Sequence, residues 1–219
     1  MQNLAKAASA EFFGTCALVC VVVGSGIMGA SVSQDSGVAL IINALSTILT
    51  LALLIYVVGP ISGAHFNPIV TLVSALENKT STSRVITYVT AQVAGAIAGA
   101  LIANVMFNLP IAQVSSHVRV SPGTLIGEAL ATAGLIVVIN TFLSRQRVDL
   151  LPVAVAAWIG SAYFFTSSTS FANPAVTIGR VFTDTFAGIA PGSVLPFISA
   201  QIIGALIGML AVRGIANGK

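Results

Sequence analysis

The sequence has 219 residues, of which 56% are hydrophobic and only 7% are charged. Because soluble domains contain about 25% charged residues, this composition excludes an ordinary soluble protein and indicates a chain embedded in lipid. The formal net charge of +3 comes from nine lysines and arginines scattered along the chain, which argues against a nucleic-acid-binding surface.

Six apolar segments are long enough to cross a bilayer, which requires about 20 helical residues. Backbone polar groups in lipid must be satisfied internally, so we expect these segments to be α-helices, and the polar alternation of a β-barrel does not occur. The first apolar run is too long for a cleaved signal peptide and is interpreted as the first span. The expected spans are residues 7–31, 37–58, 85–107, 122–143, 150–167 and 193–212.

The positions of the lysines and arginines predict the orientation of the chain. Only Arg119 and Arg180 fall on one side of the predicted membrane. The other seven fall at the two ends of the chain and in the second and fourth connections. Positive charges mark the cytoplasmic side, so we expect both termini in the cytoplasm. The seven residues are Lys6, Lys79, Arg84, Arg145, Arg147, Arg213 and Lys219.

Three patterns occur twice in the same order, which predicts an internal duplication. Each half, residues 1–110 and residues 121–219, then holds three spans. Because this number is odd, the second half must be inverted relative to the first, and the two halves form one domain over residues 1–219. The matched patterns are Glu11–Thr15 with Glu128–Thr132, residues 66–71 with 172–177, and residues 91–96 with 200–205.

Each half also contains a short apolar segment that follows a polar stretch. Residues 59–65 and 166–172 are the polar stretches, and residues 68–76 and 174–183 are too short to span. Irregular backbone at membrane depth is tolerated where it lines a cavity, so two opposed segments imply a pore. The predicted fold class is an all-α membrane protein with six transmembrane helices plus two re-entrant half-helices in two inverted repeats.

An Asn-Pro pair begins each re-entrant segment, at Asn67-Pro68 and at Asn173-Pro174. Asparagine caps the free amides of a first helical turn, and proline fits that turn because no amide donor is needed there. Two half-helices that meet at the midplane would bring their positive amino ends together. Such a midplane favours oxygen-bearing solutes and repels cations.

With Ser62-Gly63-Ala64-His65-Phe66 before the first pair, these motifs resemble the signatures of the aquaporin and aquaglyceroporin family over essentially the whole chain. The resemblance implies a homotetramer of the bacterial inner membrane, surrounded by lipid. Each subunit would have one pore for small neutral solutes, with no enzymatic activity, cofactor or metal. It also implies that backbone carbonyls before each Asn-Pro line the pore, namely those of Gly63, Ala64, His65, Thr169, Ser170 and Phe171.

Several polar residues within the spans have two interpretations. Glu11 and Glu128 are costly in lipid, so proton coupling is one alternative. In the family, the matching glutamates hold the re-entrant loops by hydrogen bonds, and we assign that role here. His65 has no second ligand at metal-binding spacing and is expected to pack the loop. Cys16 and Cys20 share a helix face and could bind a soft metal, but packing is the preferred interpretation.

The predicted constriction departs from the family. Aquaporins have an arginine three residues after the second Asn, where this chain has Val176. Counting back from each Asn without gaps adds Thr47 and Ser161, and the second re-entrant loop adds Ser170. None of these four is an arginine, a histidine or an aromatic residue. Because pore diameter and lining charge set selectivity, we expect a wider filter without a fixed positive charge.

Val176, with the segments 59–68 and 166–174, resembles the bacterial aquaglyceroporins associated with arsenic resistance. The expected function is passive conduction of arsenite, methylated arsenicals, glycerol-like polyols and water. One alternative is a general water or glycerol channel with no arsenic role. An energy-coupled transporter is another, because transporters also use half-helices at the midplane. A non-conducting protein with a plugged pore is the third.

Overall fold

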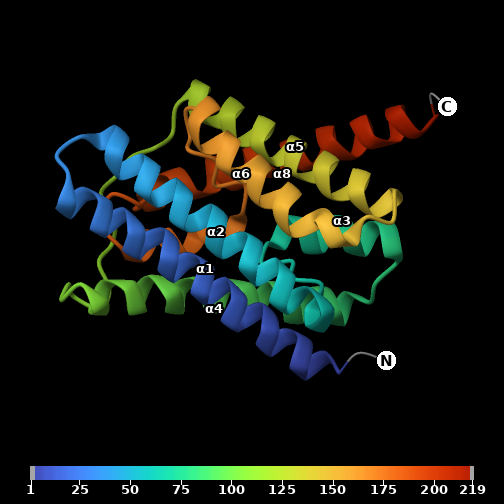
Figure 1. Cartoon of the computed structure of the whole chain (residues 1–219), viewed down its shortest axis with the longest axis horizontal. Helices are drawn as coiled ribbons and strands as arrows, with labels where there is room; N and C mark the ends of the chain where they lie inside the picture. Colours follow the sequence, from blue (N-terminus) through green and yellow to red (C-terminus); the bar gives the residue numbers. More distant parts are fainter. Residues whose placement is uncertain (1–2, 218–219) are drawn as a thin grey trace.

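The computed structural model describes residues 3–217, with side chains for residues 3–214. Its regular secondary structure consists of helices, and strands are absent from the described residues (Figure 1). Short 3₁₀ turns precede α6 and follow α7. The elements are α1 (Leu4–Val32), α2 (Ser36–Ser62), α3 (Pro68–Asn78), α4 (Thr82–Met106), α5 (Pro122–Ser144), η1 (Val148–Leu150), α6 (Leu151–Phe165), α7 (Pro174–Gly179), η2 (Arg180–Phe182) and α8 (Pro191–Asn217).

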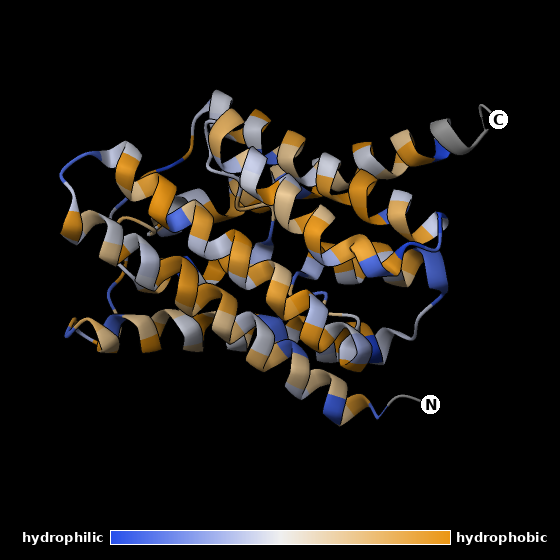
Figure 2. Ribbon diagram, in the orientation of Figure 1, coloured by the Kyte–Doolittle hydropathy of each residue, from blue (hydrophilic) through white to orange (hydrophobic). Residues whose placement is uncertain are grey.

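Six of these helices are long and apolar enough to cross a membrane: α1, α2, α4, α5, α6 with η1, and α8. Hydrophobic residues cover most of their length, and hydrophilic residues gather at the connections (Figure 2). Large apolar side chains point outward, among them Leu49 and Leu195, which are 70% and 76% exposed. Such a surface is stable in lipid and not in water. The predicted all-α membrane fold is therefore confirmed.

The predicted end of the second span differs from the structure. We expected residues 59–65 to be irregular, but α2 continues through Gly59 and Pro60 to Ser62. A proline inside a membrane helix is tolerated where neighbouring groups satisfy the freed backbone. The helix ends at Gly63, whose φ of 92° is left-handed and suits a residue without a side chain.

Closely packed helix pairs hold each half together. In the first half, α1 packs on α4, and in the second half α5 packs on α8. A Cβ placed at Gly99 of α4 would collide with the backbone of Cys16, and one at Gly204 of α8 would collide with Ala129. These glycines let the helix backbones approach, as small residues do in membrane proteins.

The two short helices α3 and α7 complete the bundle. Each packs on α4 and on α8, so each contacts the last helix of both halves. The helix α3 lies toward the end of the bundle where α1 begins and α8 ends (Figure 1). The bundle thus has two long-helix pairs around a centre where the re-entrant segments meet.

The substitution Gly99→Val should prevent the close approach of α1 and α4. Overpacking of a fitted contact costs about 1–3 kcal/mol, and here the colliding atoms belong to backbone that cannot move aside. We expect a lower Tm and loss of the monodisperse peak in detergent size-exclusion chromatography. Gly192→Val is the matched control, because a Cβ there meets no atom of the described part of the chain within 4 Å. Equal losses in both variants would contradict the packing role.

Candidate functional site

Each re-entrant helix is capped by the asparagine that precedes its proline. Asn67 is the N-cap of α3, and its Oδ1 accepts a hydrogen bond of 2.9 Å from the amide of Ile69. Asn173 is the N-cap of α7, and its Oδ1 accepts from the amides of Ala175 and Val176 at 3.0 and 3.3 Å. Because the side-chain oxygens are engaged in capping, the amide NH₂ groups remain for other contacts.

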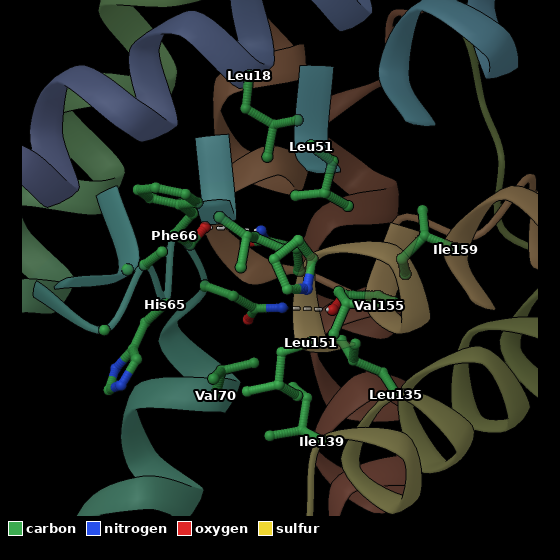
Figure 3. Close-up of a pocket in the computed structure, with 18 of the residues that line it drawn as sticks. Leu18, Leu51, His65, Phe66, Val70, Leu135, Ile139, Leu151, Val155 and Ile159 are labelled. Atoms are coloured by element: carbon green, nitrogen blue, oxygen red, sulfur yellow. Dashed lines mark hydrogen bonds between the residues drawn. The ribbon is translucent and has the colours of Figure 1, made fainter. Parts of the chain in front are cut away.

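Those NH₂ groups join the two halves of the chain. Asn67 Nδ2 donates to the carbonyl of Ala172, and Asn173 Nδ2 donates to the carbonyl of Phe66, both at 2.8 Å. Dashed lines in Figure 3 mark these bonds. Both asparagines are less than a tenth exposed. Two buried, reciprocal hydrogen bonds therefore fix the amino ends of α3 and α7 against each other.

The loops before the asparagines adopt a strained backbone with the same pattern in both halves. Left-handed φ values occur at the fourth, third and first residues before each asparagine. For residues other than glycine, this conformation costs about 1–2 kcal/mol each. The residues are Gly63, Ala64 and Phe66 in the first loop, and Thr169, Ser170 and Ala172 in the second.

A buried glutamate holds each strained loop. Glu11 of α1 accepts hydrogen bonds from the amides of His65 and Phe66, at 2.9 and 2.6 Å. Glu128 of α5 accepts from the amides of Phe171 and Ala172, at 2.8 and 2.9 Å. Both glutamates are fully buried. Their oxygens satisfy backbone donors that lie outside any helix, which stabilises the left-handed conformation.

Sequence reasoning assigned no role to the glutamine in each repeat, Gln92 or Gln201. Gln92 Nε2 donates to Glu11 Oε2 at 2.8 Å and to the hydroxyl of Thr71 on α3 at 2.9 Å. In the second half, Gln201 makes the equivalent bonds to Glu128 and to Thr177 of α7, at 2.6 and 3.0 Å. The repeated Ala-Gln pattern was the available signal, because it recurs with the repeated glutamate and threonine.

A cavity of about 630 Å³ runs past the joined asparagines. Its walls are mainly apolar and come from α1, α2, α3, α5 and α6 (Figure 3). Both re-entrant loops contribute, including Gly63, Ala64, His65 and Phe171, whereas Thr169 does not line it. The His65 ring contacts the Thr71 hydroxyl at 3.1 Å and packs edge-on against Tyr88. The labelled aliphatic residues are Leu18, Leu51, Val70, Leu135, Ile139, Leu151, Val155 and Ile159.

Three of the four predicted filter residues line this cavity: Thr47, Ser170 and Val176. All three are buried, and the hydroxyl of Ser170 has no hydrogen-bond partner among the described residues. They lie on α2, the second re-entrant loop and α7, so the fold brings together positions up to 129 residues apart. The part of the cavity wall where they meet is called the filter end below, and it also includes Tyr163 and Arg180.

The prediction for Ser161 is wrong, because this residue is exposed and does not line the cavity. The inner face of α6 carries Val155, Ile159 and Tyr163 at four-residue spacing. A residue two positions away is rotated by about 200° and points outward. Tyr163, which sequence reasoning did not place in the filter, lines the cavity and donates a hydrogen bond of 3.3 Å to Thr47.

Arg180 also lines the cavity, although sequence reasoning used it only to predict orientation. It begins η2, four residues after Val176, and is 3% exposed. The available sequence signal was its spacing from Val176, because residues four apart lie on the same face of a helix.

Six membrane helices, two capped re-entrant helices and a cavity beside their joined ends define a membrane channel. The sequence model of the major intrinsic protein family matches residues 1–170 of this chain. The chain belongs to this family of aquaporin and aquaglyceroporin channels.

Relatives agree with this assignment. The aquaglyceroporin AqpS of Rhizobium meliloti (strain 1021) is 43% identical over 211 residues, which cover 96% of this chain and 90% of AqpS. Aquaporin Z of Brucella melitensis is 31% identical over 94% of this chain and 96% of its own. The X-ray structure of the aquaglyceroporin from Plasmodium falciparum matches with a TM-score of 0.77, at 18% identity and 97% coverage of both chains. This last likeness shows the shared fold.

The substitution Glu128→Gln should destabilise the protein. One acceptor oxygen becomes a donor that faces backbone amides, and an unsatisfied buried donor costs about 1–3 kcal/mol. We expect a lower Tm in detergent. Asp149→Asn is the control, because it removes a charge from an exposed pair with Arg147 and should leave the Tm unchanged. A Tm for Glu128→Gln equal to wild type would show that the loop does not need this carboxylate.

Proposed function

We propose that the protein is a passive channel for small uncharged solutes and that arsenous acid and methylated arsenicals pass through it, together with polyols and water. The observation that carries the proposal is Val176 on the cavity wall, where aquaporins have an arginine. A valine side chain is smaller and uncharged, so it leaves room for solutes larger than water. Arsenous acid is a compact trihydroxide, largely neutral near pH 7, which resembles a polyol to such a filter.

The polar groups beside the cavity suit hydroxyl-bearing solutes. The residues before each Asn-Pro lie outside any helix, so their carbonyls are not used in helical hydrogen bonds. Each asparagine NH₂ has two N–H groups, and one of them donates across the midplane. The other is the donor that we assign to a passing solute. Apolar walls on the remaining side would keep the solute in line with these groups.

The midplane supports selection for neutral solutes. The amino ends of α3 and α7 meet there, and each carries a partial positive charge. A cation that entered the cavity would face both ends at once. The buried carboxylates Glu11 and Glu128 are occupied by loop amides and glutamine side chains, which favours a supporting role over proton coupling.

We further propose one channel domain over residues 1–219 with repeats 1–110 and 121–219, placed in the inner membrane of a bacterium. The cations Lys6, Lys79 and Arg145 belong to the start of α1, the α3–α4 connection and the α5–η1 connection. That end of the bundle would face the cytoplasm under the positive-inside rule. The proposed assembly is a homotetramer, and the apolar outer faces would contact lipid or neighbouring subunits.

The central experiment compares solute flux in proteoliposomes that contain the purified protein. In glycerol gradients we expect the vesicles to re-swell quickly as glycerol enters. Arsenite uptake should rise linearly with concentration and should not respond to a proton gradient. Fast water flux with no arsenite uptake would instead favour an ordinary water channel. Saturable uptake driven by a proton gradient would overturn the channel proposal.

The substitution Val176→Arg should restore a narrow, charged filter. We expect methylarsenite and glycerol flux to fall by on the order of tenfold or more, with a smaller effect on water, because pore diameter and lining charge set selectivity. Val176→Leu is the matched control that adds bulk without charge. Methylarsenite flux that is unchanged in Val176→Arg would remove Val176 from the filter.

A further inference from the structure

We infer that Arg180 supplies the fixed positive charge of the filter end, one helical turn beyond the position that Val176 leaves uncharged. The inference rests on the proposed pore and adds to it a residue that excludes cations. In aquaporins, a single arginine sets both the width and the charge of the filter. In this chain, Val176 would set the width and Arg180 the charge.

The position of Arg180 places its charge in the same pathway as Val176. The two residues are four apart, which corresponds to a rise of about 6 Å along a helix and a small rotation. Both line the same cavity, and both are buried. Thr47 and Tyr163, joined by a hydrogen bond, belong to the same end. Arg180 is therefore part of the pathway wall and not of the outer surface.

The guanidinium of Arg180 is held from two sides. Its Nε donates to the carbonyl of Ala187, in the connection between η2 and α8. Its Cζ lies 3.5 Å from the centroid of the Phe171 ring, which in turn packs edge-on against Phe197 of α8. Phe171 is itself fixed through its amide by Glu128. A cation stacked on a buried ring is well oriented, so the group is positioned before any solute arrives.

Among the described residues, no carboxylate forms an ion pair with Arg180. A second guanidinium, that of Arg119, lies 5.5 Å from the same Phe171 ring and donates to the carbonyls of Phe186 and Gly188. Two cations thus flank one ring. Arg119 does not line the cavity, so Arg180 is the one whose terminal N–H groups can meet a solute.

A charge in this place has two effects on solutes. By Coulomb's law with an effective dielectric constant of about 20, the charge of Arg180 lowers the occupancy of a monovalent cation about 8 Å away by a factor on the order of tens. Neutral, oxygen-rich solutes gain hydrogen bonds from the N–H groups of Arg180, which replace those of the water molecules that they lose. A widened filter that kept no charge would offer neither effect.

The test measures Na⁺ leak and glycerol flux in the same proteoliposomes. We expect Arg180→Gln to raise Na⁺ leak by on the order of tenfold while glycerol still passes, and Arg180→Lys to stay near wild type. Arg119→Gln is the matched control, because it removes a cation from the same ring but not from the cavity wall. The double variant Val176→Arg with Arg180→Gln places a positive charge at position 176, one helical turn before position 180, and should suppress the Na⁺ leak again.

The possible negative results of this experiment lead to different conclusions. Arg180→Gln that conducts glycerol with no added Na⁺ leak overturns the inference and leaves the proposed function intact. Wild-type protein that conducts no neutral solute overturns the proposed function itself. If Arg180→Gln fails to assemble, Arg180→Met provides the same test, because methionine also removes the charge. Its Na⁺ leak should exceed that of Arg180→Lys, and an equal leak in these two variants would overturn the inference.

Discussion

The structure depends on a pair of hydrogen bonds that cross its centre. Asn67 and Asn173 each donate to a carbonyl on the opposite re-entrant loop, and each caps its own helix with the remaining oxygen. An asparagine has the two functions that this place needs, an acceptor for its own helix and a donor for the other half. Aspartate has no donor, and serine is too short to cross, so the residue type follows from the geometry.

Around that centre, each half of the chain builds the same support from one carboxylate, one carboxamide and one hydroxyl. Glu11, Gln92 and Thr71 form the first set, and Glu128, Gln201 and Thr177 form the second. Each set ties the first long helix, the third long helix and the half-helix of its repeat to the strained loop. The glycine contacts between those long helices allow the short distances that these side chains need.

Much of this architecture is predictable from the sequence, because local chemistry enforces it: span length, Asn-Pro caps and repeated glycines each have one structural solution in lipid. The cavity wall is less predictable from the sequence. Counting without gaps located Thr47 on α2 but failed for Ser161, since counting gives a position along α6 and not the direction in which the helix faces. The hydrogen-bond partners of Tyr163 and Arg180 required the three-dimensional structure, because Thr47 and Ala187 come from other segments.

The left-handed residues of the two loops have an evolutionary consequence. Ala64, Phe66, Ser170 and Ala172 hold a backbone shape that elsewhere calls for glycine, and a buried glutamate on a neighbouring helix binds the amides of Phe66 and Ala172 within it. Since the shape is dictated from outside the loop, the loop side chains are released to diversify. Ser170 shows the benefit, as it offers a side chain to the lumen from a left-handed position. Natural selection can therefore retune what a lineage transports without rebuilding the path itself.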